Sequence, residues 1–160
     1  MSKDVYEASI IICDLDGTLA LNNHGRDWFD ASDCDKDAVN MPVLRILEMA
    51  LQDEGNYIVF VSGREEKYRK PTKKFLSRYE LPFRGLGRRI YFDEFPLFMR
   101  QSGDNRPDYI VKKEIWNNEI MGDLIDSPDE ILFVLDDRSQ VVKMWRELGL
   151  TCLQVADGNF

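Results

Sequence analysis

Five short runs of apolar residues predict the strands of a buried sheet. Three of them are continuous and rich in β-branched side chains, and they span residues 9–13, 57–61 and 131–135. Such runs are typical of parallel strands that are covered on both faces. Two weaker runs lie at residues 95–99 and 152–155, and Pro96 favours an edge position for the former.

Between these runs, apolar residues recur at helical spacing. The first predicted helix starts after Asn40, has Pro42 in its first turn and ends before Gly55. Two more helices are predicted over residues 107–121 and 139–148. Alternation of buried strands with amphipathic helices predicts an α/β fold, with a doubly wound, mostly parallel sheet and helices on both faces.

Length and composition predict one domain covering residues 1–160, since 44% hydrophobic residues can build one sizeable core. No run reaches the roughly 18 to 20 apolar residues of a membrane span, and the opening MSKDVYEAS lacks the apolar core of a signal peptide. Three scattered cysteines offer neither a disulfide framework nor a CxxC zinc site. We therefore expect a soluble, cytoplasmic protein with no membrane contact.

The formal net charge of −8 argues against non-specific coating of nucleic acid, which requires many Lys and Arg contacts to phosphate. A site that binds a single strand end remains compatible with this charge. Two long stretches without a predicted element, residues 20–39 and 84–94, are candidates for functional loops.

Acidic and basic side chains follow the three strongest predicted strands. These segments are Asp14-Leu15-Asp16-Gly17-Thr18, Ser62-Gly63-Arg64 and Asp136-Asp137-Arg138. Ligands of open parallel sheets bind beyond the carboxyl ends of the strands, so the three segments are expected to meet. Each pair of carboxylates about 4 Å apart would cost roughly 4 kcal/mol at an effective dielectric near 20. The sequence therefore predicts a hard divalent cation, Mg²⁺, together with Arg64 and a lysine.

The first segment suggests two separate roles for its carboxylates. Asp14, nearest the strand, is placed to attack phosphorus and form an aspartyl-phosphate. Asp16 could protonate the leaving oxygen and later deprotonate water, which requires a raised pKa of the kind that neighbouring carboxylates produce. Each segment alone could equally be turn or solvated strand-end chemistry, and only their combination favours a phosphoryl-transfer site.

The sequence resembles the haloacid dehalogenase superfamily of phosphatases in four features. These are a strand followed by Asp14-x-Asp16-Gly17-Thr18, a strand followed by Ser62-Gly63-Arg64, a helical lysine, and a strand followed by Asp136-Asp137. That resemblance implies a Rossmann-like core, Mg²⁺ dependence and an aspartyl-phosphate intermediate. Some of these phosphatases carry a cap domain, but the segments between the predicted elements leave room for a minimal cap or none.

A closer resemblance is to the 3′-phosphatase domain of the bacteriophage polynucleotide kinase-phosphatases. It rests on GRDWFDASDCDKDAVN, VSGRE, PTKKF, RQSGDNRPDYIVKKEIW and LDDRSQVVKMWRELGLTCLQVADGNF. No G-x-x-x-x-G-K-[ST] motif occurs, so kinase activity is not expected in this chain. Residues 84–94 match poorly, and the segment after Asp16 is one residue longer than in that family.

The resemblance assigns roles residue by residue. It implies Asp14 as nucleophile and Asp16 as acid and base, with Mg²⁺ held by the Asp14 carboxylate, the Asp16 main-chain carbonyl and Asp136 or Asp137. The implied phosphate- and substrate-binding residues are Ser62, Arg64, Lys112, Arg26, Arg100 and Asp108. Asp37 also matches the family, without an assigned role.

Several of these positions have plainer interpretations. Spacing of four puts Asp108 and Lys112 on one helical face, yet the two could form an exposed salt bridge, and Lys113 adjoins Lys112. Arg26 could be a surface residue, and His24 is interpreted as a loop residue. Aromatic residues that could stack on a terminal base, or pack in the core, are Trp28, Phe29, Tyr91 and Phe92. Trp116 and Trp145 fit the core.

The resulting hypothesis is hydrolysis of a terminal 3′-phosphate from DNA or RNA during end repair, with a kinase or ligase as a possible separate partner. The resemblance extends to a phage-encoded protein acting in the host cytoplasm. The main alternative is a small-molecule nucleotide phosphatase with the same catalytic residues. A receiver-type phosphoacceptor module and a non-catalytic binding module are further alternatives, and the position of Asp16-Gly17-Thr18 after the first strand favours hydrolysis over the receiver.

Overall fold

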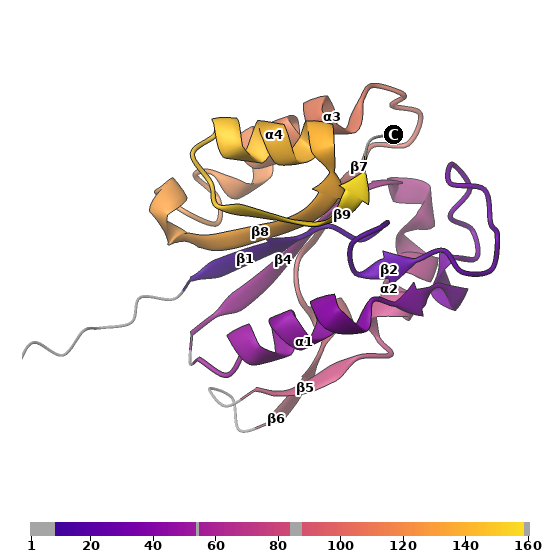
Figure 1. The fold of residues 1–160 in the computed structure, drawn as a ribbon, viewed down its shortest axis with the longest axis horizontal. Coiled ribbons are helices and arrows are strands. Elements are labelled where there is room, and N and C mark those ends of the chain that lie inside the picture. Colours follow the sequence, from indigo (N-terminus) through magenta and orange to yellow (C-terminus); the bar gives the residue numbers. More distant parts are fainter. Residues whose placement is uncertain (1–8, 54, 84–87, 159–160) are drawn as a thin grey trace, which may run out of the picture.

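A five-stranded parallel sheet forms the centre of the molecule in the computed structural model, which describes residues 9–53, 55–83 and 88–158 (Figure 1). Its strands are β1 (Ile10–Cys13), β4 (Tyr57–Glu65), β7 (Leu97–Arg100), β8 (Ile131–Arg138) and β9 (Cys152–Gly158). They lie in the order β7-β4-β1-β8-β9, and every neighbouring pair is parallel. The predicted parallel sheet is confirmed, and so is the edge position of the strand that follows Pro96.

The strand β1 is buried along its whole length because it lies between β4 and β8 and is covered on both faces. Its short aliphatic run therefore carries the segment that begins at Asp14 to the middle of the sheet edge. Both neighbours are longer than predicted, so residues 62–64 and 136–138 belong to the ends of β4 and β8. The strand ends thus hold these polar residues on hydrogen-bonded backbone rather than on loops.

Two helices cover each face of the sheet, as the doubly wound prediction requires (Figure 1). They are α1 (Met41–Ala50) and α2 (Arg69–Leu76) on one face, and α3 (Asp108–Ile115) and α4 (Ser139–Glu147) on the other. One core packs Leu47 and Phe75 against the first face, and the other packs Val111 and Trp145 against the second. The helix α3 continues as a π-helical turn over Trp116–Ile120.

The stretches without a predicted element contain two small antiparallel ribbons. The first pairs β2 (Ala20–Leu21) with β3 (Ala38–Val39), and the second pairs β5 (Glu80–Phe83) with β6 (Arg88–Tyr91). Residues 84–87 of the poorly matched stretch lie outside the described residues. Ribbons of this size agree with the expectation of a minimal cap.

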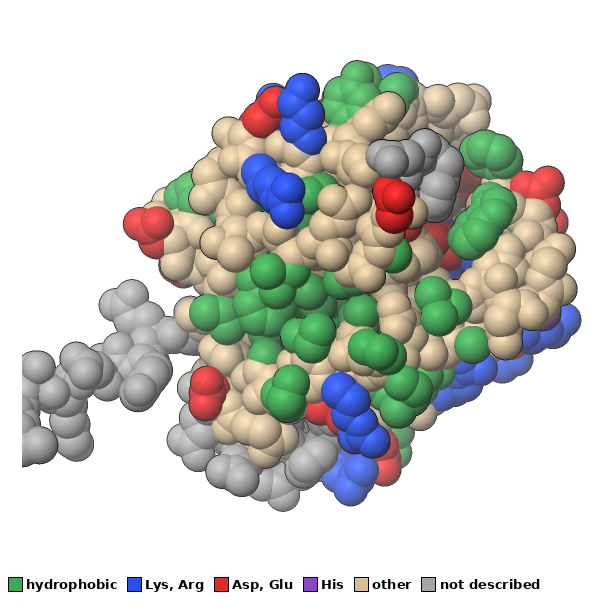
Figure 2. Space-filling view, in the orientation of Figure 1, with side chains coloured by type: hydrophobic (Ala, Val, Ile, Leu, Met, Phe, Trp, Pro, Cys, Tyr) green, Lys and Arg blue, Asp and Glu red, His purple; other side chains and the backbone are tan. Residues whose placement is uncertain are grey.

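Figure 2 shows one face of the surface, where hydrophobic side chains gather between the β8–β9 side of the sheet and α1. Exposed residues on these elements include Met49, Leu132 and Leu153. Among the helices in the described part of the chain, none is long and apolar enough to cross a membrane.

Candidate active site

A pocket of about 590 Å³ opens at the carboxyl ends of the strands. Its lining comes from the turn after β1, from the ends of β4, β7 and β8, from the segment that leads into α3 and from the segment between residues 21 and 38. The lining residues are Asp14, Asp16, Trp28, Phe29, Ala31, Gly63, Arg64, Glu65, Tyr68, Arg100, Asp104, Asn105, Arg106, Pro107, Asp108, Lys112, Asp136, Asp137 and Arg138. The three polar segments that follow the strongest predicted strands therefore meet at one edge of the sheet.

Three carboxylates form a buried cluster on the floor of this pocket. One oxygen from each of Asp14, Asp136 and Asp137 lies within 4.8 Å of the others. Burial raises the pKa of Asp14 well above its ordinary value, against the opposing effect of Lys112, and the charge of Asp136 adds to the rise. Burial, followed by Asp136, also raises the pKa of Asp137. The cluster thus carries the mutual repulsion that the sequence predicted.

Lys112 supplies a positive charge inside the cluster. Its Nζ donates to Asp14 Oδ1 at 2.6 Å and to Asp136 Oδ2 at 2.8 Å, and the residue is only 1% exposed. Lys113 is exposed, so the structure distinguishes the two adjacent lysines. The alternative of an exposed Asp108–Lys112 salt bridge is wrong, because Lys112 points into the sheet edge instead.

The turn after Asp14 fits tightly against the cluster. The hydroxyl of Thr18 donates to Asp14 Oδ2 at 3.0 Å and lies 3.3 Å from Asp137 Oδ1. Gly17 has φ +81°, and a Cβ at this position would overlap the Asp137 carboxylate. Glycine is required here both by the backbone conformation and by the closeness of β8.

Asp16 is held by two guanidinium groups. Arg64 donates from Nε and Nη2 to the two carboxylate oxygens at 2.8 and 2.7 Å, and Arg26 Nη2 donates to Oδ1 at 2.6 Å. Burial alone would raise the pKa of Asp16, but Arg64 and then Arg26 outweigh it, so the pKa lies below its ordinary value. The prediction of a raised pKa from carboxylate neighbours is wrong, because the carboxylate is directed to the arginines.

Asp37 accepts hydrogen bonds from both Arg26 and Arg64. Its side chain is fully buried and accepts from Arg26 Nε at 3.0 Å, from Arg26 Nη2 at 2.8 Å and from Arg64 Nη2 at 3.0 Å. His24 Nε2 also lies 3.0 Å from Asp37 Oδ1, so the loop histidine belongs to this network. Charge-assisted, forked contacts of this kind fix the planes of both guanidinium groups. The Arg26 side chain is only 3% exposed, which contradicts the interpretation of it as a plain surface residue.

The opposite wall of the pocket is built around Asp108. Its carboxylate accepts from Arg100 Nη2 and from Arg138 Nη1, the latter at 3.0 Å. Arg100 also donates from Nε to the Gly63 carbonyl at 2.8 Å, which links β7 to β4. A Cβ at Gly63 would overlap the Asp108 carboxylate, so the β4 backbone and the start of α3 must approach closely.

Some site contacts were not foreseen in the sequence. Trp145, interpreted there as core, is buried but also directs Nε1 toward Asp136 Oδ2 at 3.3 Å. Thr72, on α2, accepts from Arg64 Nη1 at 3.3 Å. Ser62 is fully buried and its Oγ accepts from the Arg64 main chain at 3.2 Å. The contacts of Trp145 and Thr72 share one pattern that could have indicated them in the sequence. In both, a polar or indole group lies on the face of a helix that packs against a strand end.

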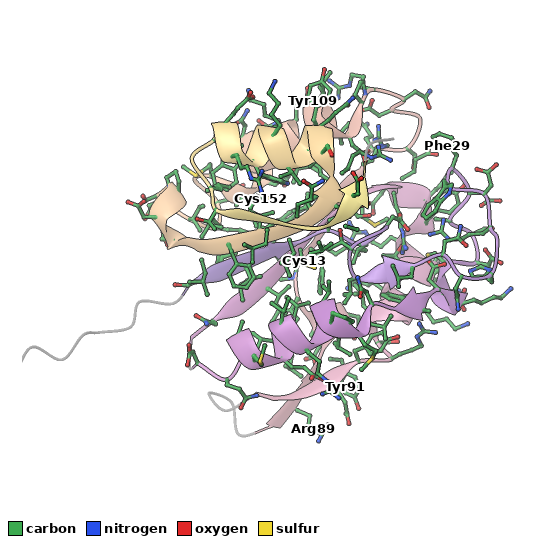
Figure 3. All side chains as sticks on the ribbon, viewed as in Figure 1. Cys13, Phe29, Arg89, Tyr91, Tyr109 and Cys152 are labelled. Carbon is green, nitrogen blue, oxygen red and sulfur yellow. The ribbon has the colours of Figure 1, made fainter. Side chains whose placement is uncertain are left out.

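The four aromatic residues considered for base stacking separate into two pairs. Trp28 and Phe29 line the pocket. Phe92 is buried in the core with α1 and α2, and Tyr91 lies at the β5–β6 ribbon, far from Phe29 (Figure 3). The prediction of Tyr91 and Phe92 near the site is wrong, and the core alternative is confirmed for Phe92. Trp116 and Trp145 pack edge to face in the core, with ring centroids 6.1 Å apart.

The donor set suits a hard divalent cation. Three buried carboxylates offer only oxygen ligands, and a cation among them would offset the effects of burial and mutual repulsion that raise the pKa values of Asp14 and Asp137. A nucleophilic carboxylate, a neighbouring lysine and forked arginine donors are also the groups that phosphoryl transfer requires. The geometry therefore fits a metal-assisted phosphoryl-transfer site.

The raised pKa values predict how stability depends on pH without a metal. The folded protein binds protons at Asp14 and Asp137 where the unfolded chain does not, so in EDTA the free energy of unfolding should increase as pH falls from neutral toward the ordinary carboxyl value of 3.8. Below that value the trend should reverse, because the lowered pKa of Asp16 makes its protonation destabilising. Urea denaturation across pH measures both trends.

Excess Mg²⁺ should remove the increase between neutral and mildly acidic pH, since a bound cation competes with protons for the same oxygens. Asp137→Asn should reduce the increase in EDTA. A free energy of unfolding that decreases steadily as pH falls from neutral toward 3.8 in EDTA would contradict the raised pKa values of Asp14 and Asp137.

Comparisons with known proteins agree with this geometry. The family model of the polynucleotide kinase PNKP phosphatase domain matches residues 8–160. A putative bifunctional polynucleotide kinase/RNA ligase of Autographa californica nuclear polyhedrosis virus is 32% identical over 143 residues, which are 88% of this chain and 18% of the viral protein.

Solved structures of a Pnkp1/Rnl/Hen1 RNA repair complex and of a Pnkp1/Rnl/Hen1 complex contain chains with the same fold. Each superposes with a TM-score of 0.80 over the whole of this chain, at 42% and 43% identity. The matched regions are 46% and 50% of those chains, so this chain spans half or less of the relatives named here.

Proposed function

Because the chain belongs to the family of polynucleotide kinase PNKP phosphatase domains, which are of the haloacid dehalogenase type, we propose that it removes the terminal 3′-phosphate from DNA or RNA ends. The observation that carries the proposal is Asp14, held by Lys112 and Thr18 on the floor of a pocket edged with arginines. Family membership also argues against the receiver-type signalling module.

In the first half of the reaction, an Asp14 oxygen attacks phosphorus and the bond from phosphorus to the 3′-oxygen breaks. The Asp16 carboxyl group gives its proton to the departing 3′-oxygen, which leaves as a hydroxyl group. In the second half, Asp16 takes a proton from water as that water attacks the aspartyl-phosphate. Phosphate leaves, Asp14 is regenerated and Asp16 is protonated again.

The arginine contacts of Asp16 bear directly on this role. With both carboxylate oxygens engaged by Arg64 and Arg26, Asp16 is held in its ionised form. Oxygens of a bound phosphate would compete for these forked donors, and release of Asp16 from them would allow it to take up a proton. Arg26 and Arg64 therefore act both on substrate and on the protonation of the acid.

Mg²⁺ would be held by the carboxylates of Asp14, Asp136 and Asp137, with the Asp16 main-chain carbonyl as a further ligand by family resemblance. When bound, it supplies positive charge that offsets the negative charge of the cluster and of the phosphate. Lys112 holds Asp14 and Asp136 in position.

The relatives support a polynucleotide rather than a small-molecule substrate. The viral relative is a putative bifunctional polynucleotide kinase/RNA ligase, and one structural relative is a chain of an RNA repair complex. On this basis we place the chain in nucleic-acid end repair, with a kinase and a ligase acting beside it. Strand ends, loops and the start of α3 line the pocket, and no separate cap domain is present among the described residues, which suits entry of a strand end.

The activity can be tested with matched phosphorylated ends. Oligonucleotides of DNA and RNA carrying a 3′-phosphate should release phosphate in Mg²⁺ and not in EDTA, while the same sequences with a 5′-phosphate should be inert. Release is measured as free inorganic phosphate. Equal rates on 3′- and 5′-phosphate ends would refute the end specificity, and faster turnover of nucleoside 5′-monophosphates would identify a small-molecule phosphatase.

A further inference from the structure

Phe29 lies at the mouth of the active-site pocket with 90% of its surface exposed. Its neighbour Trp28 also lines the pocket and is 55% exposed. Figure 3 shows Phe29 beside the end of the molecule where the strands terminate. Two adjacent aromatic residues held toward water at the entrance of a polar site point to a ligand with a flat apolar face.

The loop that carries Phe29 is fastened by its own hydrogen bonds. The Asn22 side chain donates to the Arg26 carbonyl at 2.7 Å and accepts from the Arg26 main-chain N–H at 3.1 Å. The Asp27 carboxylate accepts from the main-chain N–H of Phe29 at 2.8 Å. The carboxylate of Asp30, next along the chain, accepts from the main-chain N–H of Ser32 at 2.9 Å. Phe29 is therefore presented by a fixed backbone, which lowers the ordering cost of binding.

The same loop also contacts the proposed catalytic acid, Asp16, through Arg26. Arg26 contacts Asp16 at 2.6 Å, and its guanidinium lies 5.8 Å from the centre of the Trp28 ring. The position of the aromatic pair is thus fixed relative to the acid that serves the departing 3′-oxygen. The opposite wall of the pocket presents Arg100 and Arg138 instead. Aromatic side chains and guanidinium groups therefore line the same pocket.

We propose that Phe29, supported by Trp28, is a stacking platform for the nucleobase of the 3′-terminal nucleotide. This inference rests on the proposed function and specifies its substrate class, a 3′-phosphate attached to a base-bearing sugar. Stacking of a base on an aromatic side chain tolerates every base, because each has a π face. The platform therefore selects for the presence of a base and not for its identity.

The first test compares Phe29→Ala with Phe29→Trp on two oligonucleotides that end in 3′-phosphate, one normal and one with an abasic terminal sugar. Phe29→Ala should raise KM for the normal end by about 10-fold with kcat little changed, as expected for loss of one stacking contact. KM for the abasic end should not change, and Phe29→Trp should restore the normal KM. Tyr91→Ala, which removes an exposed aromatic side chain far from the site, is the matched control.

Nucleoside 3′-monophosphates carry the base without the polymer, so Phe29→Ala should raise their KM as it does for the normal end. An equal rise in KM for normal and abasic ends, or no change in either, would overturn the platform.

The second test separates the platform from the reaction. In an Asp14→Asn background, a 3′-phosphate oligonucleotide with a terminal 2-aminopurine should change its fluorescence on binding, and Phe29→Ala should abolish that change. If the wild-type chain released no phosphate from any 3′-phosphate, the proposed function would be refuted. The fluorescence change would still show whether Phe29 binds the terminal base. Absence of a Phe29-dependent signal would overturn the platform even if 3′-phosphatase activity were found.

Discussion

Asp14→Asn is expected to reduce phosphate release from 3′-phosphate ends by on the order of 10⁴-fold or more, because the amide cannot act as the nucleophile of covalent catalysis. Folding should persist, since the change removes one of three buried like charges and leaves Lys112 paired with Asp136. The rate of phosphate release and the denaturation midpoint measure the two effects in the same preparations.

Asp126→Asn is the matched control, because it makes the same chemical change at an exposed loop carboxylate. It should leave phosphate release unchanged. A second readout is brief incubation of the wild-type chain with substrate labelled in the phosphate, followed by acid quenching, which should leave label on the protein. Activity that survives Asp14→Asn, or label retained by that variant, would assign the nucleophile to another residue.

Lys112→Met is expected to destabilise the protein by about 3–5 kcal/mol in EDTA, because removing one partner of a buried ion pair leaves its carboxylates without compensation. Lys112 is 1% exposed and contacts both Asp14 and Asp136, and methionine preserves most of its apolar volume. Activity should be lost as well. Urea denaturation in EDTA gives the change in the free energy of unfolding.

Lys113→Met gives the matched control, since this neighbouring lysine is exposed and should change stability by no more than about 0.5 kcal/mol. Excess Mg²⁺ should recover part of the stability of Lys112→Met, because a cation at the carboxylates replaces some of the lost charge. Equal destabilisation by the two substitutions would show that Lys112 does not hold the cluster together.

The sheet could be predicted from the sequence because its strands are buried on both faces and leave continuous apolar runs. The meeting of their polar ends followed from the general rule for ligand sites of parallel sheets. The bounds of α2 could not be predicted because only Thr72, Phe75 and Leu76 of its eight residues are buried, while the other residues are mostly lysine and arginine. Its apolar stripe is too narrow to give a helical period.

Side-chain partners inside the site could not be deduced from spacing. Lys112 and Lys113 differ only in the face of α3 on which they lie, and the sheet decides which face is inward. For Asp16, proximity in sequence to Asp14 suggested carboxylate neighbours, but the carboxylate is directed to Arg64, 48 positions away in the chain. Its protonation therefore depends on a contact that only the folded chain creates.

The segment from Asn22 to Asp37 gathers Arg26, the aromatic pair Trp28–Phe29 and the buried Asp37 within one continuous insertion between β2 and β3. In the proposed mechanism, one segment therefore carries both the residues that would contact the substrate and those that would control the protonation of Asp16. Evolution or engineering could replace this segment while leaving the sheet unchanged. Each replacement would change both the leaving groups that are accepted and the pH range of activity.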